Sequence, residues 1–242
     1  MKRFKIIRNI LIIIAIIIAT VYVFWIRSNQ TNTSKTANLY KKMYQQSENI
    51  TMKISYKDER IDVTIIKATN KDKREEVSGT ICNYTDEIKK EPDSEGAIIG
   101  TITSKDKVVG YKYFPKLNKY QILYTSDEGN ESINTWISEF TEKISNCRYY
   151  TRGYEPINGK MLYCETFKEA KLKFYFDKDK LVYIKSEEID QSFNDVTDAL
   201  YSVEISNDDS YKEILKVPED EIPEEKLMKT NEDEENIQVN NR

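Results

Sequence analysis

A long uncharged apolar segment near the N-terminus places the strongest limit on how this chain folds. Residues 10–26 contain no charged side chain, and Ile, Leu, Val and Ala dominate them. As a helix the segment spans roughly 25 Å, at about 1.5 Å per residue, against a hydrocarbon core about 30 Å thick. Tyr22, Phe24 and Trp25 lie at its far end, and aromatic residues favour the membrane interface. We therefore expect one transmembrane helix over residues 10–26.

The charges that flank this segment predict its orientation. Residues 1–9 are basic and contain no acid, their bases being Lys2, Arg3, Lys5 and Arg8, whereas only Arg27 follows the segment closely. The positive-inside rule places such an N-terminus in the cytoplasm and the rest of the chain outside the cell membrane.

A cleaved signal peptide is the alternative interpretation, since its N-terminal region looks the same. The apolar run exceeds the usual length of about 7–15 residues, and no small-residue cleavage site follows it. Val21, Val23 and Trp25 occupy the nearest positions. These features favour an uncleaved anchor.

The rest of the chain, from residue 28 onwards, carries a net negative charge. Residues 28–218 carry 29 basic and 32 acidic residues, and residues 219–242 carry nine acids against three bases. No basic patch of the kind that nucleic-acid binding requires is present, so no nucleic-acid partner is expected. Residues 219–242 are predicted to form an acidic, disordered tail.

The composition argues against an enzyme. Histidine is absent, which removes the most frequent general base and the most frequent metal ligand. No glycine-rich phosphate-binding loop occurs, and an adjacent pair such as Ser104-Lys105 on a turn is a poor candidate for a Ser-Lys catalytic pair. We expect no catalytic residue, no cofactor and no metal.

Three cysteines leave two alternatives open. Cys82, Cys147 and Cys164 form no Cys-x-x-Cys pair, so a zinc site is not expected. One disulfide, Cys147–Cys164, is compatible with an extracytoplasmic location. Three partly buried thiols are the other interpretation.

Beyond the apolar segment the pattern of apolar residues changes twice. Residues 27–36 are a polar linker, and Leu39, Tyr40, Met43 and Tyr44 give a helical stripe between about residues 36 and 47. Alternation then predicts strands over 50–57 and 60–66, with further strands over 74–84, 97–103, 107–114 and 119–125.

The second half of the chain repeats the order of one helix followed by strands. An amphipathic helix is predicted over residues 131–145, with Trp136 and Phe140 on its apolar face. Asn158-Gly159 favours a type I′ hairpin turn. A hairpin over residues 172–184 and a last strand over residues 199–206 follow.

These elements predict an α+β domain over residues 37–218. Tight turns between successive strands imply an antiparallel sheet, and a sheet of about ten strands curls instead of staying flat. We expect a strongly curved, open half-barrel with its helices on the concave face.

The order of these elements resembles the Lol lipoprotein-carrier superfamily. The segments that carry the resemblance are YEPINGKMLYCETF, KLKFYFDKDKLVYIKSE, ALYSVEIS and YKEILKVPEDE, in which Phe176-Asp177, Leu181 and Val217-Pro218 match the family's closing strands and ending. The chain departs from the carriers in having an apolar anchor and in lacking their Arg-bearing region. The resemblance implies a distant, membrane-anchored member that binds an apolar ligand.

Two functions remain open from the sequence. The first is a binding module whose apolar groove takes a lipid, a lipoprotein or another envelope ligand, lined by Tyr113, Trp136, Phe140, Phe174 and Phe176. Ordinary packing of these aromatic residues in a sheet is the alternative role. The second function is an interaction or scaffold domain of a cell-envelope complex, without a small-molecule ligand.

Overall fold

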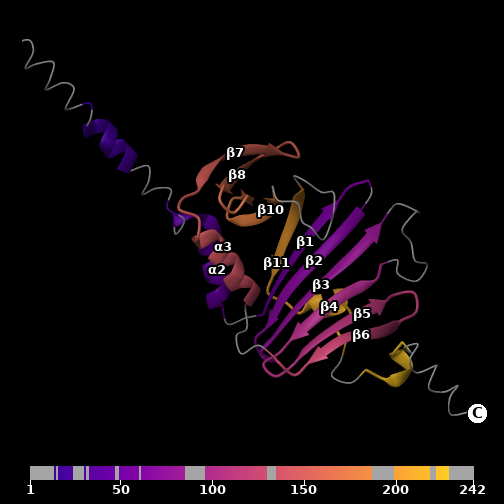
Figure 1. Cartoon of the computed structure of the whole chain (residues 1–242). Helices are drawn as coiled ribbons and strands as arrows, with labels where there is room; N and C mark the ends of the chain where they lie inside the picture. Colours follow the sequence, from indigo (N-terminus) through magenta and orange to yellow (C-terminus); the bar gives the residue numbers. More distant parts are fainter. Residues whose placement is uncertain are drawn as a thin grey trace, which may run out of the picture. The chain divides into compact units, whose positions relative to one another are not determined.

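A computed structural model gives the fold of the chain (Figure 1). It describes residues 14, 16–23, 30, 33–46, 49–59, 61–84, 96–129, 135–186, 199–218 and 222–228. The described chain separates into two compact units, where the sequence predicted one domain. We call Met1–Met43 with Ser138–Asp198 the hairpin unit, and Tyr44–Ile137 with Ala199–Arg242 the meander unit.

The meander unit is built on seven strands in the order β6-β5-β4-β3-β2-β1-β11, each antiparallel to its neighbour. Figure 1 shows β1 to β6 as adjacent arrows. The strands are β1 Ile50–Lys57, β2 Ile61–Asn70, β3 Glu75–Tyr84, β4 Ile98–Thr103, β5 Val108–Phe114, β6 Lys119–Ser126 and β11 Leu200–Ser206.

One face of this meander carries the buried core of the unit. Ile66, Val77, Ile98 and Tyr113 pack there against Leu215, which follows the short helix α4 (Ser210–Ile214). A 3₁₀ turn, η4 (Glu224–Lys226), comes later in the chain. The segment after β11 therefore covers part of the sheet that the earlier strands form.

The hairpin unit contains strands β7 Thr151–Ile157, β8 Lys160–Phe167, β9 Leu172–Asp177 and β10 Lys180–Ser186, each antiparallel to the next. Asn158 and Gly159 join β7 to β8 with φ angles of 49° and 77°. Both residues thus have the positive φ that a type I′ turn requires, and the predicted hairpin is confirmed.

Two longer helices are present, α2 (Lys35–Gln45) and α3 (Thr135–Ser145). The N-terminus of α2 is held by side chains of the hairpin unit. The hydroxyl of Ser34 accepts the backbone N–H of Ala37 at 2.9 Å, as an N-cap does. The buried carboxylate of Glu165 on β8 accepts the N–H of Lys35 at 2.8 Å and that of Thr36 at 2.9 Å. Four donors of the helix end need such acceptors, so the first turn of α2 is fixed on β8.

The α+β class and the antiparallel sheet are confirmed, and the described part of the chain contributes eleven strands where the sequence predicted about ten. Strand β2 runs to Asn70, past the predicted end at residue 66, because burial continues through Ala68 and Thr69. Helix α3 is described from Thr135 onwards, so the predicted turn over residues 131–134 lies outside the described residues.

The predicted transmembrane helix lies only partly within the described residues. Residues 16–23 are helical and their apolar side chains are exposed, whereas residues 10–13, 15 and 24–26 are not described. No helix in the described part of the chain has the length and apolar character needed to cross a bilayer. The span over residues 10–26 is not supported by the structure and stays a prediction from the sequence.

Candidate functional site

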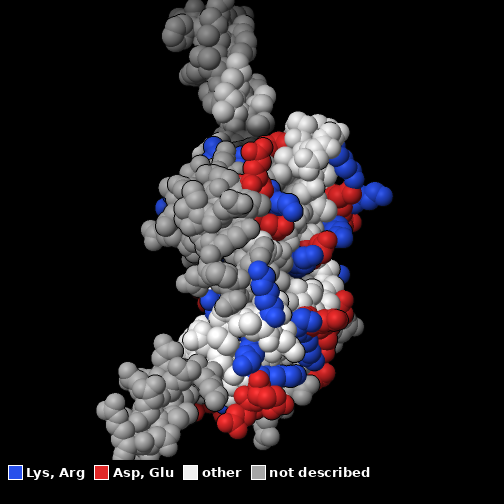
Figure 2. All heavy atoms as spheres, turned by 90° about the vertical axis from the view of Figure 1, so that its right-hand side faces the viewer, with Lys and Arg blue, Asp and Glu red and all other residues white. Residues whose placement is uncertain are grey.

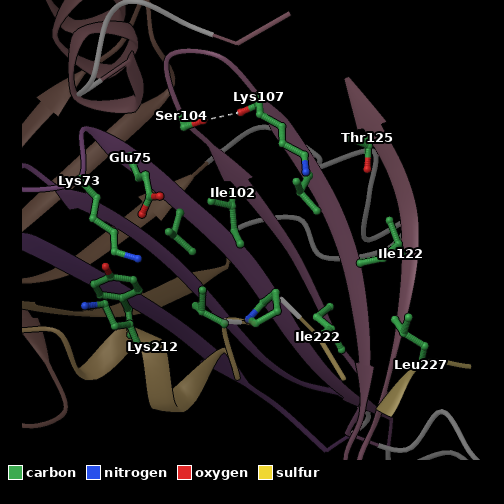
Figure 3. A pocket seen from close by; sticks show the side chains of 15 residues that line it. Lys73, Glu75, Ile102, Ser104, Lys107, Ile122, Thr125, Lys212, Ile222 and Leu227 are labelled. Carbon is green, nitrogen blue, oxygen red and sulfur yellow. Dashed lines mark hydrogen bonds between the residues drawn. The ribbon is translucent and has the colours of Figure 1, made fainter. Parts of the chain in front are cut away.

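The meander unit contains a groove of about 660 Å³ on the same face as its buried core. Strands β3 to β6 supply one side of it, and described residues between Tyr211 and Pro218 and between Ile222 and Leu227 supply the other (Figure 3). Its lining consists of Lys73, Glu75, Val77, Ile102, Ser104, Lys107, Val109, Ile122, Thr125, Tyr211, Lys212, Val217, Pro218, Ile222 and Leu227. The volume falls within the roughly 300–1,000 Å³ of small-molecule sites.

The floor of the groove is apolar because strand register brings similar residues into one row. Val77 on β3 lies opposite Ile102 on β4, and Ile102 lies opposite Val109 on β5. Thr125 on β6 continues the row opposite Val109, with Ile122 nearby on the same strand. Four strands at about 4.8 Å spacing make this row about 14 Å wide.

Two glycines allow the chain after α4 to lie close to the sheet. Gly79 and Gly100 face each other on β3 and β4. A Cβ at Gly79 would lie 2.6 Å from the Leu215 side chain, and a Cβ at Gly100 would lie 2.3 Å from the Tyr111 ring. Only a residue without a side chain leaves this room, so both positions require glycine for close approach.

The end of α4 is fixed by its own backbone and by Tyr111 on β5. Lys216 has a positive φ of 48°, and Val217 N–H donates to the Lys212 carbonyl at 2.9 Å, as in a Schellman motif. The hydroxyl of Tyr111, buried on β5, donates to the Leu215 carbonyl at 3.0 Å. These bonds hold the start of the groove wall at a defined position.

Tyr120 on β6 holds both ends of the chain that forms this wall. Its hydroxyl donates to the Lys216 carbonyl at 2.9 Å, and its carbonyl accepts the N–H of Met228 at 2.7 Å. Leu227 also forms a parallel bridge with Tyr120. We call the described residues 217–218 and 222–227 the strap, because the residues that flank them, Lys216 and Met228, both bond to Tyr120.

Part of the strap lies beyond the predicted domain boundary at Pro218. The sequence predicted an acidic tail over residues 219–242, disordered beyond about Lys229. Ile222 and Leu227, within that stretch, line the groove. Residues 219–221 and 229–242 lie outside the described residues, so the disorder stays a prediction from the sequence.

The rim of the groove is polar. Figure 3 shows Lys73, Glu75 and Lys212 at one end and Ile222 and Leu227 at the other. Lys212 donates to Asp209 at 2.5 Å, and this hydrogen bond raises the pKa of the Lys212 ammonium. The groove thus combines an apolar floor with charged groups at its edge.

We searched the described residues for a metal site and the face drawn in Figure 2 for a basic patch. Within the described residues no group of three or more Cys, Asp or Glu side chains is arranged to hold a metal ion. On the face drawn in Figure 2, Lys and Arg side chains are interspersed with Asp and Glu. The visible charges do not form a continuous basic patch.

Two of the predicted ligand-lining residues are buried in the meander unit. Tyr113 is 7% exposed and its hydroxyl donates to the Asn118 side chain at 2.9 Å. Trp136 is 6% exposed and its indole N–H donates to the Thr69 hydroxyl at 3.2 Å. Both are packed and hydrogen-bonded, and neither lines the groove.

The other three predicted residues belong to the hairpin unit. Phe174 is fully buried and packs edge-on against Phe140 and Tyr40, which stack on each other at 5.1 Å between ring centroids. Phe176 is buried beside Tyr163. The five residues are divided between two units and packed against other side chains there, so a role for them in ligand binding stays a prediction.

Cys147 and Cys164 are not joined to each other in the structure, and the disulfide stays a prediction from the sequence. Both thiols are buried, and Cys82 is half-buried. Cys164 on β8 lies opposite Gly153 on β7, whereas the Cys147 thiol faces the Lys143 carbonyl at the end of α3. The thiols are thus directed to different partners, and burial raises the pKa of both.

A separate polar cluster lies in the hairpin unit, on strands β7 and β9. The carboxylate of Glu155 accepts the ammonium of Lys173 at 2.8 Å and the hydroxyl of Tyr175 at 2.9 Å. The hydrogen bond from Lys173 is the largest cause of the lowered pKa of Glu155. These groups satisfy one another, which is typical of a structural ion pair.

The comparisons with known proteins assign no family. No protein-family model matches the chain, and no curated protein matches its sequence. Among solved structures, the chain is similar to an uncharacterised conserved protein from Thermus thermophilus, with 10% identity over 81% of this chain and 98% of that chain. The TM-score is 0.35, which is too low to support an argument on fold or function. The resemblance to the Lol superfamily therefore stays a prediction.

Proposed function

We propose that this protein is a binding module for an apolar, lipid-like ligand, which lies in the groove of the meander unit. The observation that carries the proposal is the row of Val77, Ile102 and Val109 across three adjacent strands, under a strap held at both ends by Tyr120. Sites for small ligands are typically concave and mostly apolar, with a few polar groups at defined places.

The groove favours an acyl chain over a peptide. Strands β3, β4 and β5 each have a hydrogen-bonded neighbour on both sides, so their backbone groups are already paired. A peptide on this floor would lose the hydration of its own N–H and C=O groups without gaining partners, and that loss is costly. A hydrocarbon chain has no such groups, and burial of its surface is favourable.

The sequence places this function at the cell membrane. The uncharged segment 10–26 would anchor the chain, and the basic residues before it would keep the N-terminus in the cytoplasm. The ligand would then be a lipid, a lipoprotein or another envelope component outside the membrane. A curved half-barrel with helices on its concave face, as the number of strands and their tight turns predicted, belongs to the same proposal.

A photoreactive fatty acid tests the groove directly. We expect the full chain, held in lipid nanodiscs, to be labelled on β3 to β6 and on the strap, as mapped by mass spectrometry of the peptides. Labelling confined to residues 10–26 would mean that the probe reacts only from the bilayer, and the proposal would fail.

A pair of variants on one strand makes this test specific. Ile102 lines the groove, whereas Ile99 on the same strand is 52% exposed and is absent from the lining. Ile102→Asp is expected to reduce labelling strongly, and Ile99→Asp is expected to leave it unchanged. Because Ile102 also packs against the core, Val109→Trp serves as a second variant, which fills the groove without adding a charge.

An interaction domain of an envelope complex is the second candidate function. Leu123 and Tyr124 on the outer strand β6 are 45% and 50% exposed, and Ile99 is exposed on β4. Clustered exposed apolar residues often mark protein contacts. Substitution of Leu123 and Tyr124 by serine would remove a specific crosslink to a partner while leaving fatty-acid labelling intact, and the reverse result would favour the lipid-binding function.

A further inference from the structure

The polar rim of the groove contains more positive than negative groups. Among its lining residues are three lysines, Lys73, Lys107 and Lys212, and one acid, Glu75. Lys212 is bound to Asp209, and Figure 3 shows Lys73 and Glu75 on neighbouring parts of the same end. Lys107 differs from Lys212 because it forms no ion pair with any residue that the structure describes.

The turn between β4 and β5 holds Lys107 at the edge of the floor. Both the backbone N–H and the hydroxyl of Ser104 donate to the Lys107 carbonyl, at 2.8 Å and 3.0 Å. In Figure 3 the Lys107 side chain extends from this turn towards the groove. Ile102 and Val109, on the strands that the turn joins, form the apolar floor directly beside it.

Thr125 adds a hydroxyl to the same side of the groove. It lies opposite Val109 in the register of β5 and β6 and lines the groove with Lys107. An ammonium and a hydroxyl can both donate hydrogen bonds to one anionic group. Lysine is a frequent phosphate and carboxylate ligand that acts as a point charge.

We infer that the ligand is a single-chain amphiphile with an anionic head group, a carboxylate or a phosphate, which Lys107 and Thr125 bind at the edge of the groove while the chain lies across Val109, Ile102 and Val77. This inference rests on the proposed function, since it assigns the ligand class of the same groove. A floor about 14 Å wide, formed by one row of side chains on four strands, has room for one chain of moderate length.

Competition among four amphiphiles with the same dodecyl chain tests the head group. Dodecanoate, dodecyl phosphate, dodecyl maltoside and dodecyltrimethylammonium each compete with the photoreactive fatty acid for labelling of the groove in the full chain. We expect the two anionic compounds to compete about fivefold better than the neutral one at low salt, a preference that added salt weakens. Stronger competition by dodecanoate than by dodecyl phosphate would indicate a free fatty acid as the ligand, and the reverse would indicate a phospholipid derivative.

Two lysines on one turn provide the matched control. Lys107→Gln should abolish the preference for anionic compounds and leave competition by the maltoside unchanged. Lys105→Gln removes the same charge from an exposed neighbour that does not line the groove, and it should preserve the preference.

The outcomes separate the inference from the proposed function. Equal competition by all four compounds would overturn the anionic head group and leave a lipid-binding groove. A preference for the cationic compound would also overturn the anionic head group. An equal effect of Lys105→Gln and Lys107→Gln would overturn it as well. If the groove is not labelled at all, the proposed function fails and the inference falls with it.

Discussion

The carboxylate of Glu165 accepts three hydrogen bonds from Lys35 and Thr36, two from backbone N–H groups and one from the Thr36 hydroxyl at 2.6 Å. Glu165 is completely buried, and its carboxylate also accepts the Tyr163 hydroxyl at 3.0 Å. A negative charge at the positive end of a helix is favourable. The first turn of α2 is thus fixed on β8 by the side chain of Glu165.

Glu165→Gln should destabilise the hairpin unit by about 2–3 kcal/mol, because hydrogen bonds to a charged group are lost and a side-chain N–H₂ faces backbone donors. Urea unfolding followed by circular dichroism measures this change. The control is Glu204→Gln, since Glu204 is 71% exposed and pairs with Lys53 at only 3.4 Å. Equal stability of the two variants would contradict the role assigned to Glu165.

Alanine at two strand glycines should have opposite consequences. At Gly100 a Cβ would lie 2.3 Å from the buried Tyr111 ring, whereas at Gly153 the nearest atom is the Cys164 sulfur at 3.9 Å. Gly100→Ala is expected to cost about 1–3 kcal/mol through overpacking and to loosen the Tyr111–Leu215 bond. Gly153→Ala should be neutral or slightly stabilising, because alanine restricts the unfolded chain. Thermal unfolding of both variants checks this contrast.

The strands could be predicted from the sequence because their signal is local. Alternation of Ile61, Val63 and Ile65 is visible within one segment, and Asn158-Gly159 predicts its own turn. The bounds of β3 to β6 differ from those predicted by one residue at most. Side-chain period and turn chemistry are properties of neighbouring residues, so one sequence suffices to find them.

The groove could not be predicted because it depends on register between distant segments. Val77, Ile102 and Val109 form one row only when three strands pair in the observed register. Ile222 and Leu227 stand among acidic residues, a composition typical of disorder. For the large aromatic residues the sequence left two roles open, lining of a groove and ordinary packing, and the structure buries both Trp136 and Phe174.

Two truncations should separate the strap from the acidic tail. A chain that ends at Met228 keeps the bonds of Lys216 and Met228 to Tyr120 on either side of the strap, and we expect it to be labelled by the photoreactive fatty acid as the full chain is. A chain that ends at Pro218 loses the wall residues Ile222 and Leu227, and labelling of β3 to β6 should fall several-fold. Equal labelling of the two truncated chains would exclude the strap as a wall of the site.

Alkylation distinguishes free thiols from the disulfide that the sequence left open. Cys82 is half-buried and should react first with iodoacetamide in the folded protein. Cys147 and Cys164 should react slowly, because both are buried and burial raises the pKa of each thiol, and the thiolate is the reactive form. After unfolding without a reductant, mass spectrometry should find all three cysteines modified. Modification of Cys82 alone would restore the Cys147–Cys164 disulfide.

The ion pair of Glu155 with Lys173 should make part of the stability depend on pH. The Lys173 hydrogen bond lowers the pKa of Glu155 below its usual value of 4.5. A carboxyl whose pKa is lower in the folded state contributes stability above the unfolded-state pKa and loses it as the pH falls through the folded-state value.

Wild type should therefore exceed Glu155→Gln in stability near neutral pH by up to about 1 kcal/mol, a small value because the carboxylate is partly exposed and screened by solvent. This gap should close in acid, once Glu155 is protonated in the folded protein. Urea unfolding of both proteins across the acidic range measures it. A gap that stays constant from neutral pH into acid would assign the effect to packing, because packing does not depend on the charge of the carboxylate, whereas the hydrogen bonds from Lys173 and Tyr175 both lower the pKa of Glu155.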